Sequence, residues 1–444
     1  TPASITVFSA QEIQQLGIHE LHELTNLVPG FQSKRQSEGV TVNSISSRGR
    51  QVGTGTRSVK VIINGQAITS GYSGSSIGSF HIVPLDNVSK VEFIRGPGSV
   101  VFGSGALIGI INIETFQNES YLKVGVGNNG YVTNTVNYHS DGLQFSGIFR
   151  SSQGDQYSLK DIDSGNRIQS TDPSSQGHIY LSKKVDGNYY SLHSHHLNAS
   201  DFYSFERVDD GLNSQEINYS SASFQHVISS SKFHDISVAG IFNRRVHKFS
   251  ALLSAPGVLN GASSPNSEAP IRAFAINKTN DYDLTLLSDW LLIDGHFTLG
   301  SQYHYAEPVI ATAFANFNLQ QLAQADFPVD YYGNNPIATP YVNKQESHTL
   351  AIFAEYQQQL SPQLNTIYSL RYDYAQNIKE GELLPRVAFI YEINEHHFLK
   401  ALYSQAFRNP DAIEIGAINN STLLGDENLS SETITSQELI WLAQ

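Results

Sequence analysis

Alternation of apolar and polar residues dominates the chain from about residue 119 onward and restricts the fold more than any other feature. In LNTIYSLRYDY at 364–374, leucine and tyrosine residues share one face, while asparagine, serine, arginine and aspartate share the other. A period of two is typical of a β-strand with one apolar face. We read fourteen such strands, near 119–127, 131–140, 142–152, 176–185, 188–198, 215–228, 232–245, 278–290, 295–306, 347–359, 363–375, 382–393, 396–407 and 431–442.

The connections between these strands alternate between short and long. Every second one is a short turn, at 140–142, 185–188, 228–232, 293–295, 360–363 and 393–396. The others are mostly long, at 153–175, 199–214, 246–277, 307–346 and 408–430, with 128–130 and 376–381 as short exceptions. A bacterial outer-membrane barrel has short turns at one rim and long loops at the other, whereas a soluble sandwich has no reason to segregate them. The pattern therefore predicts a mainly β fold, a transmembrane antiparallel β-barrel.

The composition excludes several other classes of protein. Lys and Arg total 27 against 41 Asp and Glu, which gives a formal charge of −14 and argues against nucleic-acid binding. The absence of cysteine rules out disulfides and thiolate metal sites. The longest apolar runs, such as ALIGIINI at 106–113, are too short for a membrane-spanning helix.

The first part of the chain has a different texture and predicts a small α+β domain at 1–116, ahead of the barrel at 117–444. Ser9 and Glu12 form a capping box at the start of a helix, and Pro29-Gly30 ends a second helix. Strand-like segments follow, and Asn64-Gly65 is a turn dipeptide between two of them.

The end of this domain resembles a known signature. The segment PLDNVSKVEFIRGPGSVVFGSGALIGIINIET at 84–115 is similar to the sequence that closes the plug domain of TonB-dependent outer-membrane receptors. Phe407, Arg408 and Pro410 resemble the Phe-Arg-x-Pro box of the same family's barrel. The resemblance implies a plug inside a barrel of the 22-stranded type, of which about fourteen strands are present. We therefore expect the natural protein to be longer, with further C-terminal strands.

The resemblance also implies roles for individual residues. Glu92 and Arg95, in VEFIR, belong by resemblance to a charged lock between plug and barrel wall, although a local ion pair is the alternative. Substrate contact falls to outward-facing plug loops, where Arg35, Gln36, Tyr72 and Ser75 are the candidates and plain turn chemistry is the alternative.

Two groups of residues raise the question of a bound metal. Asp161 and Asp163 lie in an acidic outer loop and are candidate calcium ligands, by resemblance to cobalamin receptors of this family, but a solvated acidic loop is the favoured explanation. His193 and His195 share one face of a strand, but without a third ligand a place at the rim or in the lumen is favoured over a metal site. We otherwise expect no cofactor.

By resemblance, the protein is an active transporter in the outer membrane of a Gram-negative bacterium and not an enzyme. Its cargo would be a scarce metal chelate, with a ferric siderophore first and cobalamin or haem as alternatives. Its partners would be outer-membrane lipid and TonB, bound through a TonB box upstream of this chain. A non-transporting surface receptor or adhesin on the same barrel is the alternative from another class.

Overall fold

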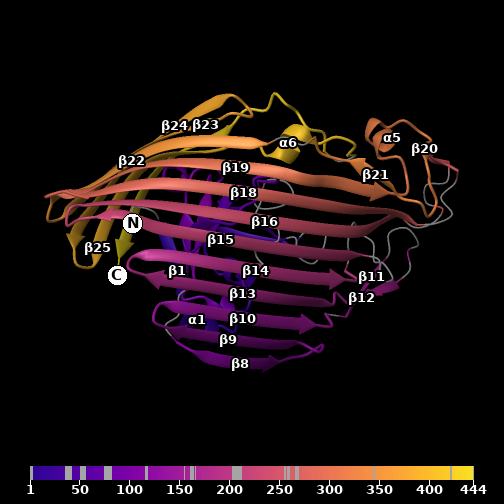
Figure 1. Cartoon of the computed structure of the whole chain (residues 1–444), viewed down its shortest axis with the longest axis horizontal. Coiled ribbons are helices and arrows are strands. Elements are labelled where there is room, and N and C mark those ends of the chain that lie inside the picture. Colours follow the sequence, from indigo (N-terminus) through magenta and orange to yellow (C-terminus); the bar gives the residue numbers. More distant parts are fainter. Residues whose placement is uncertain are drawn as a thin grey trace.

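The computed structural model consists of one large curved antiparallel sheet with a small α+β plug against its concave side (Figure 1). The structure describes the whole chain except residues 1–3, 36–42, 51–56, 75–82, 116–118, 155, 161–164, 166, 203–212, 255–256, 258–260, 266–269, 344–345, 421–422 and 444. Both features are those that the sequence predicts.

The plug is built on a five-stranded sheet with the order β1-β6-β7-β4-β5. Its strands are β1 (Ser4–Ser9), β4 (Val59–Ile63), β5 (Gln66–Ala67), β6 (Lys90–Arg95) and β7 (Gly109–Glu114). Only β4 and β7 pair in parallel. Around this sheet lie α1 (Ala10–Gln15), α2 (Leu21–Thr25), the hairpin of β2 (Phe31–Arg35) and β3 (Asn43–Ser47), the 3-10 turn η1 (Leu85–Asn87) and α4 (Ser99–Phe102).

Local signals in the plug act as expected. Ser9 caps α1, and its side chain and that of Glu12 form the reciprocal capping box. Asn64 and Gly65 both have positive φ, 49° and 81°, as the tight turn between β4 and β5 requires. The second helix is shorter than its sequence suggests, because α2 ends at Thr25 and the chain continues in turns to Gly30.

The large sheet has fifteen strands, of which fourteen follow one another in chain order from β8 to β26 while β21 pairs with the end of β19. All fourteen predicted strands are present. They are β8 (Tyr121–Val126), β9 (Val132–Ser140), β10 (Leu143–Ser152), β13 (Ser174–Val185), β14 (Asn188–Ser200), β15 (Ser214–Ser230), β16 (His234–Ser254), β18 (Ile271–Leu291), β19 (Gly295–Ala315), β22 (Ser347–Ser361), β23 (Leu364–Ala375), β24 (Glu380–Asn394), β25 (His397–Arg408) and β26 (Glu432–Ala443).

The turns and loops are segregated to opposite ends of the sheet. Short hairpins lie at one end, while the longer connections gather at the other, on the right in Figure 1. These connections contain β11 (Tyr157–Lys160), β12 (Arg167–Ser170), β17 (Ser263–Ser264), α5 (Leu319–Gln324), β20 (Val329–Asp330), β21 (Ile337–Pro340) and α6 (Ala412–Gly416). We call these the long-loop end and the short-turn end.

The two faces of the large sheet differ in polarity. On β23, Arg371 and Asp373 point toward the plug and are each 2% exposed, whereas Leu370 and Tyr372 on the other face are 48% and 44% exposed. Apolar side chains therefore cover the outside, and polar side chains line the inside. Among the described residues, no helix is long and apolar enough to cross a membrane.

Candidate functional site

The plug loop after β5 fits closely against the inner wall of the large sheet. Arg245 Nη2 on β16 donates to the carbonyl oxygen of Ile68 at 2.7 Å, and the backbone N–H of Gly71 donates to Asp281 Oδ1 on β18 at 2.8 Å. A Cβ atom at Gly71 would lie only 2.3 Å from the Cβ of Ala306 on β19. Residue 71 must therefore be glycine for the loop to approach the wall so closely. We call residues 68–74 the apex loop.

Tyr72, a predicted substrate contact, lies in this apex loop and is covered by outer loops. It is 4% exposed and packs in a small apolar cluster with Ala311, Val342 and Ala412. Its carbonyl oxygen accepts a hydrogen bond of 3.2 Å from Ile413 N in α6. Burial, reinforced by the nearby Tyr341, raises the pKa of Tyr72 well above its usual range, so the phenol is neutral.

Arg57 of the plug joins the apex region to the segment that carries α6. Its Nε lies 3.3 Å from Asp411 Oδ2, and its Nη1 lies 2.9 Å from Glu414 Oε1. Asp411 also caps α6, because its Oδ1 accepts from Glu414 N at 2.9 Å. The side chains of Arg57, Asp411 and Glu414 are 11%, 2% and 14% exposed, so one plug cation satisfies two largely buried carboxylates. We call residues 409–418 the α6 segment.

The two carboxyl groups respond differently to this environment. Burial raises the pKa of Asp411 to about 6, despite the opposing effect of Arg57. Burial also opposes ionisation of Glu414, but hydrogen bonds from Arg408 and the charge of Arg57 hold the pKa of Glu414 below its usual range. Glu414 is therefore the permanently charged partner, and Asp411 is the one that can change its protonation state.

A chain of alternating charges continues from the α6 segment to the edge of the sheet. Arg408, of the Phe-Arg-x-Pro box, lies 2.7 Å from Glu414 and 3.3 Å from Glu432 on β26. Glu432 in turn lies 2.6 Å from Arg50 of the plug. Ion pairs of this kind add little net stability, but they can fix one arrangement of two surfaces.

A further plug arginine contacts β26. Arg48 Nη2 lies 2.6 Å from Glu438 Oε1, and a Cβ atom at Gly96 would lie 2.8 Å from the same carboxylate oxygen. Gly96, in the IRGPG part of the plug signature, thus leaves room for the carboxylate. Three plug arginines, at positions 48, 50 and 57, therefore bind acidic residues of the barrel part of the chain.

The two residues predicted to form the lock lie on β6 with different neighbours. Glu92 is 2.9 Å from Lys90 Nζ and accepts from Asn112 Nδ2 at 2.9 Å, and burial is outweighed by these contacts, which lower its pKa. Arg95 Nη1 donates to the carbonyl oxygen of Pro29 at 3.2 Å. These contacts lie within the plug, so a lock that joins Glu92 and Arg95 to the wall stays a prediction.

For the other predicted site residues, the structure gives either a backbone position alone or no description. Arg35 is the last residue of β2, where its backbone pairs with Asn43 of β3. Gln36, Ser75, Asp161 and Asp163 lie outside the described residues. Their roles in substrate or calcium binding remain predictions.

Two contacts of buried basic residues were missed by sequence reasoning, one within the plug and one between the plug and the wall. Lys60 Nζ on β4 donates to the carbonyl oxygens of Phe102 and Ser104, at 2.5 and 3.2 Å, and burial lowers its pKa to about 8 against the opposing charge of Asp283. Arg150 on β10 forms a buried ion pair with Asp86 of the plug. For Arg150, the sequence signal was a basic residue on the polar face of a barrel strand. That signal places the residue on the inside of the barrel but does not identify its partner.

His193 and His195 both point into the lumen, as favoured from the sequence. His193 Nε2 and His178 Nδ1 are 3.2 Å apart, and the three imidazoles are at most 8% exposed. Within the described part of the chain, no group of three or more histidine, aspartate or glutamate side chains is arranged to hold a metal ion.

Comparison with known proteins matches both parts of the chain. The profile of the "TonB-dependent Receptor Plug Domain" matches residues 1–110, and that of the "TonB dependent receptor-like, beta-barrel" matches residues 115–441. A vitamin B12 transporter, BtuB of Vibrio vulnificus, is 26% identical over 193 residues, which cover 42% of this chain and 29% of that relative. The matched stretch thus spans less than a third of that relative's length.

Solved structures share the fold over nearly the whole chain. The siderophore receptor PirA of Acinetobacter baumannii superposes with a TM-score of 0.69 at 15% identity, covering 99% of this chain and 68% of that one. The ferric yersiniabactin uptake receptor FyuA of Yersinia pestis gives 0.69 at 14% identity, covering 100% and 70%. With the two profile matches, the plug inside the curved sheet and its arginine contacts, the chain belongs to the TonB-dependent receptor family.

Proposed function

We propose that this chain forms the plug and most of the wall of an energised importer that takes a metal chelate across the outer membrane of a Gram-negative bacterium. The observation that carries the proposal is the plug seated on the inner face of the curved sheet, where plug residues Arg48, Arg50 and Arg57 are bound to carboxylates of the barrel part. A passive pore has no use for such a stopper. A stopper held by ion pairs can be released by force and can re-form.

The long-loop end would face the outside and receive the cargo. Arg35, Gln36, Tyr72 and Ser75 are the proposed plug contacts. Because the α6 segment and Tyr341 cover Tyr72 in this structure, cargo would reach Tyr72 only after the α6 segment moves. The TonB protein would then pull the plug from the short-turn end through a TonB box, by strand addition.

A ferric siderophore is the proposed cargo, and cobalamin is the second candidate. The sequence match to a vitamin B12 transporter supports cobalamin as the second candidate, whereas the matches to siderophore receptors, at 14–15% identity, support the fold alone. Both cargos are metal chelates too large for diffusion through ordinary porins.

The test is uptake by a deletion strain to which the native gene has been restored. Uptake is compared between cells that have TonB and cells that lack it. The cargos offered are a panel of ⁵⁵Fe-labelled siderophores, ⁵⁵Fe-labelled haem and ⁵⁷Co-labelled cobalamin. We expect one cargo to accumulate only in cells with TonB, while its binding at the surface persists without TonB. Accumulation without TonB would refute energised import, and binding without accumulation in either strain would support the surface receptor instead.

A further inference from the structure

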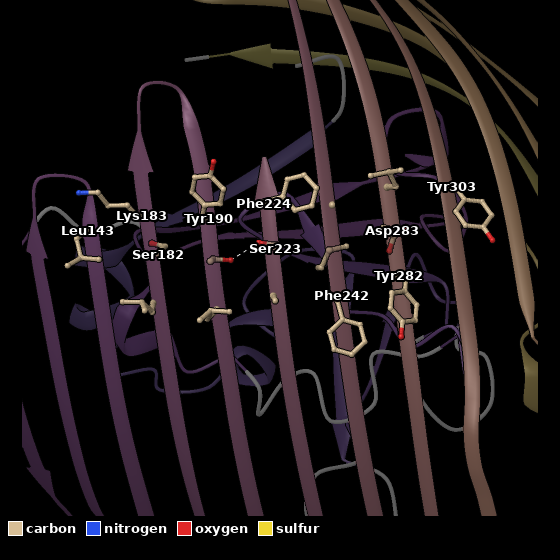
Figure 2. Close-up of a pocket in the computed structure, with 17 residues that line it drawn as sticks. Leu143, Ser182, Lys183, Tyr190, Ser223, Phe224, Phe242, Tyr282, Asp283 and Tyr303 are labelled. Carbon is tan, nitrogen blue, oxygen red and sulfur yellow. Dashed lines mark hydrogen bonds between the residues drawn. The ribbon is translucent and has the colours of Figure 1, made fainter. Parts of the chain in front are cut away.

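A groove of about 680 Å³ crosses the outer face of the large sheet, on the side away from the plug (Figure 2). Its walls are almost wholly apolar and come from seven consecutive strands of the sheet, β10 to β19. The main lining side chains are Leu181, Tyr190, Leu192, Phe224, Phe242 and Tyr282. These side chains project outward and are partly exposed, Leu192 to 56%, so the groove opens to whatever surrounds the barrel.

Small residues make the groove hollow. Ala222 on β15 lies in register between Leu192 and Phe242. Gly240 on β16 is paired with Phe224, and a Cβ atom there would lie 2.4 Å from the Phe224 ring. The absence of a side chain at Gly240 lets this ring lie low across the sheet. The floor of the groove, formed by Ala222 and Gly240, therefore lies close to the backbone of the sheet, while larger side chains form its rims.

The groove is inclined, so it rises from the short-turn end into the middle of the apolar band. Lys183 at one end is two residues before the end of β13, and Tyr303 at the other is eight residues after the start of β19. Six residues at ~3.4 Å each, on strands tilted by about 40°, give a rise of roughly 15 Å. This is about half of the ~30 Å hydrocarbon core, the depth of one lipid leaflet.

A cation stands at the interfacial end of the groove. Lys183 Nζ donates to the carbonyl oxygen of Asp141, at 2.6 Å, in the hairpin turn that precedes β10. Figure 2 shows Lys183 beside this turn, with Leu143 and Tyr190 next to it. An ammonium group at this depth is placed to meet a lipid phosphate, while the apolar groove leads from it toward the bilayer centre.

We propose that the groove is a binding site for one glycerophospholipid of the inner leaflet, with its phosphate on Lys183 and one acyl chain along the floor formed by Ala222 and Gly240. The proposal rests on the outer-membrane location given above, because that location puts the short-turn end among the phospholipids. The charge and the depth of the groove together favour a phospholipid over an apolar molecule that lacks a phosphate.

The experiment is native mass spectrometry of the full chain taken from nanodiscs that contain phosphatidylglycerol, phosphatidylethanolamine, lipid A and diacylglycerol. Lys183→Gln removes the cation, and Ala222→Phe fills the floor. Lys232→Gln, at another turn of the same end, and Ala401→Phe, which lies between the outward-facing Phe389 and Leu439, are the matched controls. Folding of each variant is checked by heat-modifiable migration in gels.

We expect the wild-type chain and both controls to retain one phospholipid, and Lys183→Gln and Ala222→Phe each to reduce its occupancy by roughly tenfold. The proposal is overturned by loss in Ala222→Phe alone, by retention unchanged in both variants, or by a preference for lipid A or diacylglycerol. Because retention is measured on purified protein, it is independent of uptake. If the wild-type receptor imported none of the offered cargos, the proposed function would be refuted, but the lipid retention measured here would be unchanged.

Discussion

Removal of Arg57 should release the α6 segment from the plug. Arg57→Gln leaves the carboxylate of Asp411, 2% exposed, without the cation that lies 3.3 Å away, while Glu414 keeps Arg408. Breaking a buried ion pair from one side costs about 3–5 kcal/mol. We expect a cost at the lower end of this range, because Asp411 Oδ1 still accepts the capping hydrogen bond from Glu414 N. A loss of ~3 kcal/mol corresponds to a rise of roughly 150-fold in local opening.

The assay is hydrogen–deuterium exchange of peptides that cover the α6 segment, where Ile415 N and Ala417 N are protected by helical hydrogen bonds. Arg167→Gln, an exposed arginine on β12, is the matched control. Asn at position 411 preserves the cap without a charge, so Arg57→Gln with Asp411→Asn should exchange within about tenfold of wild type. Unchanged exchange in Arg57→Gln, or no rescue by the second substitution, would refute the reasoning.

Three further predictions follow from the same contacts. Gly71→Ala should make the plug more sensitive to protease, because its Cβ would lie 2.3 Å from Ala306, whereas Gly177→Ala, in open space, should not; equal sensitivity would contradict this. Arg150→Met should lower the urea concentration that exposes the plug, since it leaves Asp86 buried and unpaired, at a cost of about 3–5 kcal/mol, and Asp86→Asn in the same chain should restore much of it. Because the pKa of Asp411 is raised to about 6 when the α6 segment is docked, the docked state binds more protons between pH 4 and 6. Protection of this segment, corrected for intrinsic exchange, should therefore fall as pH rises through that window, and Asp411→Asn should abolish the slope.

The strand pattern could be predicted because a barrel wall imposes one rule on every residue. Each outward side chain faces an apolar medium and each inward one a polar lumen. The two faces that the alternation in LNTIYSLRYDY predicts are therefore the two faces of β23, with Arg371 and Asp373 on the inner one. The lengths of β16, β18 and β19 were underestimated, because each of these strands has 21 residues and extends beyond its predicted bounds. Beyond the apolar band the two faces no longer differ in polarity, and the alternation that marks a strand disappears while the pairing continues.

The contacts between plug and wall could not be predicted from the sequence. Periodicity indicates the face on which a residue lies, but Arg57 and Glu414 are 357 residues apart, and nothing local specifies that pairing. The predicted lock at Glu92 and Arg95 was assigned by resemblance. The structure adds arginines 48, 50 and 57, whose partners lie on β26 or in the α6 segment.

The most direct test of the account is a reversible bridge between plug and wall in cells. The chain has no cysteine, so Arg48→Cys with Glu438→Cys provides one pair at a contact now closed by a 2.6 Å ion pair. A short thiol-specific crosslinker with a reducible spacer should join the two residues, abolish accumulation of the cargo, preserve its surface binding, and release uptake when reductant is added. Failure to crosslink, or undiminished uptake through fully crosslinked protein, would contradict a plug that is held by these arginines and must move.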